Sequence, residues 1–98
     1  MSGDFATAVR RVILGIPKGR VSTYGEVAAF AGYPKAHRAV ARLLADGGGG
    51  LPWQRVLGAG GEIKLPYEKG SEQRMLLQME GVGFRGRRVD MTKHRWQP

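Results

Sequence analysis

The lack of cysteine does most to limit how this chain of 98 residues can fold. Disulfide bonds and thiolate–metal sites are excluded, and the two histidines, His37 and His94, lie far apart in sequence. A chain of this length buries about 60 to 70% of the surface that it exposes when unfolded, which suffices for one core but not for two. We therefore expect one domain over residues 1–98, stabilised by packing alone, with no metal and no other cofactor.

The net charge indicates a polyanionic partner. Sixteen lysines and arginines against eight acidic residues give a formal charge of +8. Nucleic acid suits this charge; the alternatives are an anionic membrane or a protein that is merely basic and soluble. No dense lysine tract of the membrane-anchor kind is present, no apolar run approaches the roughly 20 residues that span a bilayer, and residues 1–16 lack a signal-peptide cleavage pattern. We expect an intracellular protein that binds nucleic acid and no membrane.

The first part of the chain shows helical periodicity. Asp4 is placed to cap a helix that Gly15 and Pro17 would end. The residues expected on its buried face are all apolar: Phe5, Val9, Val12, Ile13 and Ile16.

Residues 23–44 have the pattern of a helix-turn-helix. Thr23 and Glu26 fit a capping box that opens a helix, and Gly32 would stop it. The next helix has an apolar stripe at helical spacing, formed by Ala36, Ala39, Val40, Leu43 and Leu44. Its opposite face carries His37, Arg38, Ala41 and Arg42. A helix face of small and basic side chains is suited to enter a DNA groove.

The second half of the chain is expected to be less regular. Residues 46–50 form a glycine-rich loop, and two β-prone runs, residues 56–57 and 62–65, are expected to pair as a hairpin around a glycine turn. Such a hairpin is typical of a wing. Ser71 is placed to cap a last helix that ends at Gly81. Its apolar residues are Met75, Leu76 and Met79, and the residues that follow it look extended or irregular.

Four sequence blocks resemble the O6-alkylguanine-DNA alkyltransferases: residues 23–28, 34–40, 52–56 and 76–81. The third block resembles the Pro-Cys-His-Arg-Val active site of that family, with Trp53 in place of the nucleophilic cysteine and Gln54 in place of its histidine partner. The chain thus resembles the alkyltransferase-like proteins, which keep the lesion-binding domain and have lost the transfer chemistry. The resemblance implies a mostly α fold: a single winged helix-turn-helix domain with a short β-hairpin wing, like the C-terminal domain of the transferases.

The resemblance also implies how the chain binds DNA. In the transferases the helix-turn-helix binds the minor groove, an arginine replaces the extruded guanine in the base stack, and a tyrosine crowds the adjacent phosphate. Arg38 and Tyr24 match those two residues. A planar guanidinium stacks well on bases; the alternatives are a plain phosphate contact for Arg38 and a core position for Tyr24. The residues expected to contact DNA are Tyr24, Lys35, Ala36, His37, Arg38 and Arg42.

A lesion pocket is expected beside Trp53, whose ring offers an aromatic face to the alkyl group, unless the ring only fills the core. Pro66 departs from the family pattern, which has tyrosine or, in some alkyltransferase-like proteins, arginine at this position. Two alternatives follow: the adjacent Tyr67 substitutes after a one-residue shift, or Pro66 leaves a wider mouth for bulky alkyl groups. The expected pocket residues are Tyr24, Trp53, Val56, Pro66 and Tyr67.

Alkyl transfer is not expected from this pocket. The indole of Trp53 is no nucleophile at neutral pH, and the amide of Gln54 does not titrate and cannot relay a proton. We expect Glu80, which matches the glutamate that orients the family's histidine, to accept a hydrogen bond within the fold, with Gln54 as the candidate donor. Arg55 is expected to tie the pocket loop to the rest of the domain.

Three functions of different classes follow. The first is a monomeric, non-enzymatic sensor that binds O6-alkylguanine in double-stranded DNA; its hand-over to nucleotide excision repair proteins is implied by the resemblance alone. The sensor would be cytoplasmic and nucleoid-associated in a bacterium, or nuclear in a eukaryote. The second is a winged-helix regulator that reads base edges in the major groove. The third is an enzyme that uses Glu80 as a base on a flipped nucleotide, for which no titratable partner is evident.

Overall fold

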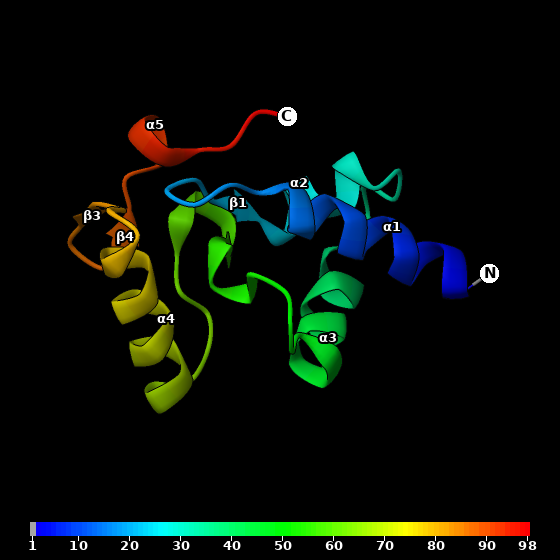
Figure 1. Cartoon of the computed structure of the whole chain (residues 1–98), viewed down its shortest axis with the longest axis horizontal. Coiled ribbons are helices and arrows are strands. Elements are labelled where there is room, and N and C mark those ends of the chain that lie inside the picture. The colour runs from blue at the N-terminus through cyan, green and yellow to red at the C-terminus, as the bar shows by residue number, and fades with distance from the viewer. Residues whose placement is uncertain (1) are drawn as a thin grey trace.

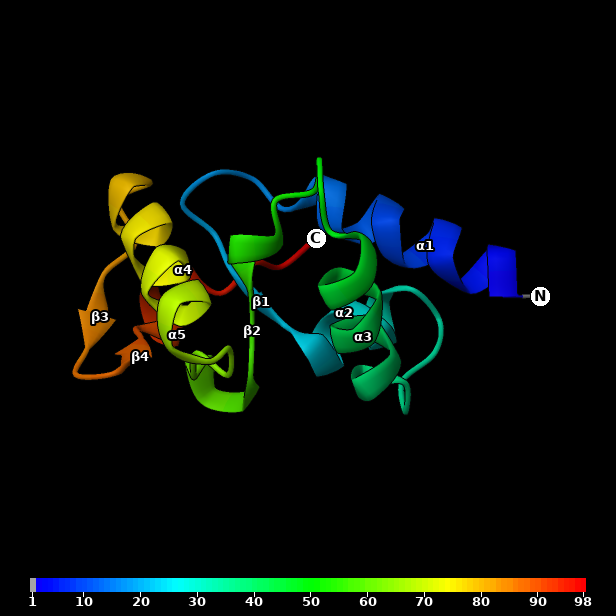
Figure 2. The same ribbon diagram turned by 90° about the horizontal axis from the view of Figure 1, so that it is seen from below.

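The computed structural model describes residues 2–98. Helices α1 (Ser2–Gly15), α2 (Tyr24–Phe30) and α3 (His37–Gly47) form one end of the molecule (Figures 1 and 2). Helix α4 (Tyr67–Met79) lies at the other end, next to strands β3 (Phe84–Arg85) and β4 (Arg88–Val89). Strands β1 (Ser22–Thr23) and β2 (Val56–Leu57) pair between these two groups. The mostly helical fold with short strands agrees with the expectation from sequence.

Helix α1 buries the predicted face. Val9, Ile13 and Ile16 are fully buried or nearly so and form the first core with residues of α2, α3 and β2. Asp4 is not its cap, because the helix begins at Ser2 and places Asp4 in the first turn. A carboxylate there still favours the helix through the positive end of the helix dipole.

The turn between α2 and α3 follows the prediction. Thr23 caps α2: its hydroxyl oxygen accepts from the Glu26 amide at 3.1 Å, while the Glu26 carboxylate accepts from the Thr23 amide at 3.0 Å. At the other end Gly32 adopts a φ of 95°, the left-handed conformation that ends a helix. The Gly32 and Tyr33 amides then donate to the carbonyls of Ala29 and Ala28, a Schellman motif that directs the chain into α3.

Helix α3 packs on α2 through a narrower face than expected. Val40 is buried and Leu43 and Leu44 are partly buried, but Ala39, predicted in the core, is exposed. Successive residues of a helix are about 100° apart, so Ala39 falls at the edge of a stripe centred near Val40. Ala41, expected to be exposed, is partly covered instead.

The predicted hairpin of residues 56–65 is not regular. Strand β2 pairs in parallel with β1, with Ser22 opposite Val56. Val56 and Leu57 are both buried, so this strand is covered on both faces and does not show the alternating exposure of a surface hairpin. The turn after β2 retains only an isolated bridge between Gly58 and Glu62. The antiparallel hairpin lies instead in the part expected to be irregular, where β3 (Phe84–Arg85) pairs with β4 (Arg88–Val89).

Helix α4 begins earlier than predicted and buries another face. Its N-cap is Pro66 and not Ser71, which is exposed within the helix. The buried residues are Gly70, Gln73 and Leu77, whereas Met75 and Met79 are 53% and 73% exposed. Gly70 explains why this face of α4, and not the predicted one, is buried: a Cβ on this residue would lie 2.7 Å from the carbonyl oxygen of Leu65. The missing side chain lets the helix approach that backbone.

The C-terminal segment returns to the helical end. The short helix α5 (Met91–His94) leads to Trp96, whose amide donates to the Val21 carbonyl at 2.8 Å and whose ring packs on the first core. A second core under α4 is formed by Val21, Leu57, Leu77, Val82 and Val89. Between Ser2 and Pro98, no helix has both the length and the apolar character needed to cross a membrane.

Candidate nucleic-acid interface and pocket

The start of α3 presents basic side chains to solvent. Lys35, His37, Arg38 and Arg42 are all exposed, as predicted, whereas Ala36 is the N-cap and packs partly against the first core. Within residues 2–98 no carboxylate pairs with Arg38 or Arg42. Their guanidinium groups are therefore available to an anionic or aromatic ligand.

A cavity of about 430 Å³ lies against the same helix, although none of these four basic residues lines it. Helix α3 supplies one wall, the 3-10 turn η1 (Trp53–Arg55) another, and the start of α4 with the residues before it a third. The volume falls in the usual range of small-ligand sites, about 300–1,000 Å³. Its lining residues are Tyr24, Ala41, Leu44, Ala45, Asp46, Gly48, Gly49, Trp53, Leu65, Pro66 and Lys69.

Three of the five predicted pocket residues line this cavity: Tyr24, Trp53 and Pro66. Val56 does not, because strand β2 turns it into the first core, where it is 1% exposed. Tyr67 does not either: it is 93% exposed and borders two shallower hollows around α4. The outer wall is thus formed by Pro66 without the neighbouring tyrosine.

Tyr24 joins the helix-turn-helix to the cavity. It is the first residue of α2, directly after the Thr23 cap, and its side chain is partly buried against the first core and lines the cavity. Burial raises the pKa of its phenol. The hydroxyl group, which is neutral at physiological pH even at the ordinary tyrosine pKa, can donate a hydrogen bond.

Trp53 and Lys69 form a contact that the sequence analysis missed. The Lys69 ammonium lies 4.3 Å from the centroid of the Trp53 ring, within cation–π range. Trp53 is held by η1, whose Pro52 carbonyl accepts from the Arg55 amide at 3.0 Å. Only the true start of α4 brings Lys69 to the cavity, so a helix assumed to begin at Ser71 gave no signal for this residue.

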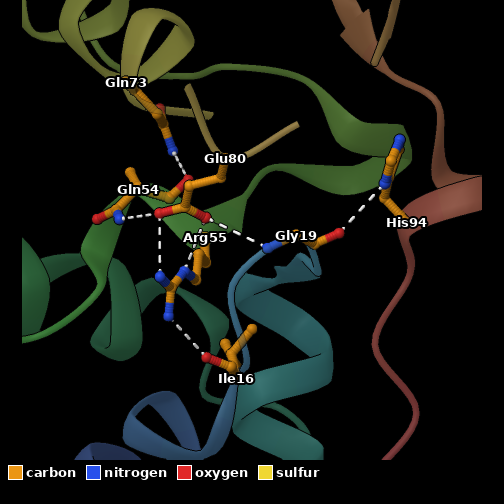
Figure 3. A network of polar contacts seen from close by, with 7 residues as sticks. All are labelled: Ile16, Gly19, Gln54, Arg55, Gln73, Glu80 and His94. Carbon is orange, nitrogen blue, oxygen red and sulfur yellow. Dashed lines mark hydrogen bonds and ion pairs between the residues drawn. The ribbon is translucent and has the colours of Figure 1, made fainter. Parts of the chain in front are cut away.

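Behind the cavity, Glu80 ties three segments together (Figure 3). Its carboxylate accepts a hydrogen bond from the side-chain Nε2 of Gln54 at 2.7 Å. It also accepts from Arg55 Nε and Nη2 at 2.9 and 3.0 Å. Arg55 Nη1 also donates to the Ile16 carbonyl at 2.9 Å, and the Gly19 amide approaches Glu80 at 3.5 Å. The predicted hydrogen bond from Gln54 and the tethering role of Arg55 are both confirmed.

This network keeps Glu80 ionised. Burial opposes the charged form, but hydrogen bonds from Arg55 and Gln54, the charge of Arg55 and the Gly19 amide outweigh it and lower the pKa of the carboxyl group. A carboxylate so stabilised is a weak base.

Gln73 supports the same turn from α4 and was also missed. Its side chain is 1% exposed, and its Nε2 donates to the carbonyls of Gln54 and Val56 at 3.1 and 2.9 Å (Figure 3 draws the residue). A polar residue in the middle of an apparently amphipathic helix gives no sequence signal that it faces inward.

A family model and two named relatives match most of the length of this chain. Residues 4–82 match the DNA-binding domain of the 6-O-methylguanine DNA methyltransferases. The DNA base-flipping protein of Vibrio parahaemolyticus is 39% identical over 98 residues, which cover 97% of this chain and 98% of that protein. Alkyltransferase-like protein 1 of Schizosaccharomyces pombe is 31% identical over 104 residues, covering 97% and 96% of the two chains.

Two solved structures of related proteins, both in complex with DNA, have a similar fold. S. pombe Atl1 in complex with damaged DNA containing O6-carboxymethylguanine has a TM-score of 0.83 at 30% identity, covering 98% of this chain and 97% of that chain. Mycobacterium tuberculosis OGT in complex with DNA has a TM-score of 0.64 at 37% identity, covering 79% of this chain and 49% of that chain. The chain belongs to the family of the 6-O-methylguanine DNA methyltransferase DNA-binding domain and, within it, to the alkyltransferase-like proteins.

Proposed function

We propose that this protein is a non-enzymatic sensor of O6-alkylguanine in duplex DNA. It binds the minor groove through α3, rotates the modified nucleotide into the cavity beside Trp53, and fills the vacated place in the stack with Arg38. One observation carries the proposal: a cavity of about 430 Å³ opens on the same helix that presents Arg38, which has no acidic partner among the described residues.

The energetics of flipping favour a damaged base. Extruding a nucleotide costs a few kcal/mol, and less when alkylation has already weakened pairing with cytosine. Stacking of a protein group on neighbouring bases returns about 1–3 kcal/mol. The guanidinium of Arg38 suits this role because it is planar and can also hydrogen-bond the orphaned cytosine.

Around the flipped base, Tyr24 and Trp53 supply aromatic walls and Ala41 leaves room on the α3 side. The neutral phenol of Tyr24 stands where the helix-turn-helix meets the cavity, so it can crowd the phosphate of the rotating nucleotide without electrostatic repulsion. Lys35, His37, Ala36 and Arg42 complete the proposed DNA contact, the basic ones through phosphates.

The alkyl group stays on the base in this proposal. The chain has no cysteine, and the indole of Trp53 offers no nucleophile at neutral pH. Gln54 cannot relay a proton, and its amide already donates to Glu80 at 2.7 Å. Glu80 itself is committed to Arg55, which disfavours the hypothesis that it activates a water molecule.

A sensor that leaves the lesion in place requires a second system to remove the nucleotide. We assign that step to nucleotide excision repair proteins, which would recognise the distorted duplex held by a monomer of this chain. The protein would act wherever the cell keeps its DNA: in the cytoplasm on the nucleoid, or in the nucleus.

A competition titration tests the proposal. Two duplexes that differ only in one guanine or one O6-methylguanine compete for the protein at one fixed salt concentration, because DNA affinity depends steeply on salt, and the DNA is then analysed by mass spectrometry. We expect preference for the modified duplex with the methyl group still attached. Equal affinity would instead favour a general or sequence-specific DNA-binding protein, and loss of the methyl group would show an enzyme.

A further inference from the structure

Lys69 places a positive charge at the wall of the cavity that receives the lesion in the proposed function. Its ammonium lies 4.3 Å from the centroid of the Trp53 ring, and the residue is one of the cavity's lining residues. The side chain is 55% exposed, so it is solvated and able to move. The flexible four-carbon side chain of lysine lets the ammonium group stay in contact with a ligand that displaces it from the Trp53 ring.

We propose that Lys69 is a specificity-determining residue that favours O6-alkyl groups bearing a negative charge. The inference rests on the proposed function, since it assumes that the alkyl group points toward Trp53. An alkyl group that packs on this ring must meet the ammonium that already covers it. A neutral group displaces the ammonium and loses the cation–π contact, whereas an anionic group exchanges that contact for a charge-assisted hydrogen bond.

Two acidic residues limit the effect. Asp46 lines the same cavity and repels an anionic group. Glu72 lies one turn along α4 with its carboxylate 3.5 Å from the Lys69 ammonium, but it does not line the cavity. This exposed pair is a weak competitor, because solvent-exposed ion pairs contribute little. The ammonium therefore stays available to a ligand on the Trp53 face.

An isosteric pair of adducts isolates the charge. Duplexes carrying O6-carboxymethylguanine or O6-carbamoylmethylguanine have the same shape, and only the first is anionic. We expect the wild-type protein to bind the carboxymethyl duplex about fivefold more tightly, the size expected of a charged hydrogen bond weakened by solvent. In Lys69→Met, which keeps an unbranched side chain against Trp53, this ratio should fall to about one, while Lys69→Arg should retain it.

Lys64→Met is the matched control. Lys64 is exposed to a similar degree, 58%, its ammonium pairs with an acidic residue, Glu62, as that of Lys69 does with Glu72, and it does not line the cavity, so its loss should leave the ratio unchanged. Two results would overturn the role of Lys69 alone, provided that both adducts still bind better than guanine. One is a wild-type ratio of one between the affinities for the two adducts, and the other is an equal fall of this ratio in Lys64→Met. If neither adduct binds better than guanine, the proposed function fails as well, so the two failures are distinguishable.

Discussion

The start of α3 and the Glu80 network use charge in opposite ways. Arg38 and Arg42 on α3 are exposed and lack acidic partners within residues 2–98, whereas Arg55 is bound on three sides by Glu80 and the Ile16 carbonyl. Paired guanidinium groups fix the backbone around them, and unpaired ones remain available to bind phosphate or bases. The same residue type thus holds the pocket loop in one region and forms the candidate DNA-binding surface in the other.

Breaking the network should have the largest effect on stability. Glu80→Ala leaves Arg55 partly buried without its partner, so we expect a loss of about 3 kcal/mol in the free energy of unfolding, at the low end for a broken buried ion pair. Urea denaturation followed by circular dichroism measures it. Glu68→Ala, in the exposed first turn of α4, is the control and should lose less than about 1 kcal/mol, the size of a carboxylate's interaction with the helix dipole. Equal losses in both variants would show that the network does not stabilise the pocket loop.

Breaking the binding surface should leave stability intact and weaken lesion binding. Arg38→Ala should reduce affinity for an O6-methylguanine duplex by about 10- to 100-fold, because the vacated stack stays empty. Arg42→Ala removes only a phosphate contact and should cost less than about tenfold, equally for damaged and undamaged DNA. Fluorescence anisotropy measures both. The proposed role of Arg38 in filling the base stack is contradicted if Arg38→Ala loses no more affinity for damaged DNA than Arg42→Ala does.

Acid should weaken the Glu80 network. The folded pKa of Glu80 is lowered, so its contribution to stability is present above the unfolded value of about 4.3 and is lost as the pH falls through the folded pKa. Wild-type protein should therefore exceed Glu80→Gln in stability at pH 7 by about 1 to 2 kcal/mol, with a smaller difference near pH 3. A difference that does not change between the two pH values would mean that Glu80 gains nothing from ionisation.

The smallest expected effect concerns chemistry. Trp53→Cys restores the family's nucleophile, yet we expect no methyl transfer, because Gln54 cannot generate a thiolate and the Glu80 carboxylate remains committed to Arg55. Mass spectrometry of the protein after incubation with methylated duplex measures the transfer. Stoichiometric methylation of this variant would show that Gln54 is not what prevents the reaction.

Local signals in the sequence predicted the first half of the molecule. The Thr23 capping box and the left-handed Gly32 depend on residues within one turn, so their geometry can be inferred from spacing alone. The contact between Gln54 and Glu80 was also predicted, but through the family resemblance, since 26 residues separate the pair.

In the second half, long-range packing decides the secondary structure, and there the predicted hairpin of residues 56–65 and the predicted start of α4 were wrong. Contacts between segments that lie apart in the chain determine that β2 pairs with β1 and that α4 buries the face carrying Gly70. Hydrophobic periodicity does not reveal such contacts. The misplaced start of α4 then hid Lys69, whereas the burial of Gln73 was missed because its side chain is polar. Tyr24, Trp53 and Pro66 were therefore predictable as residues of the cavity, and Lys69 was not.

Tryptophan fluorescence tests the central claim most directly. The chain has two tryptophans, and Trp96→Phe leaves Trp53 as the only one while keeping an aromatic ring near Phe30. With both duplexes at saturation, we predict that O6-methylguanine DNA quenches Trp53 and that the guanine duplex does not, with the methyl group still on the recovered DNA. The same Trp53 signal from both duplexes would contradict the account, because the lesion would then not enter the cavity beside this ring.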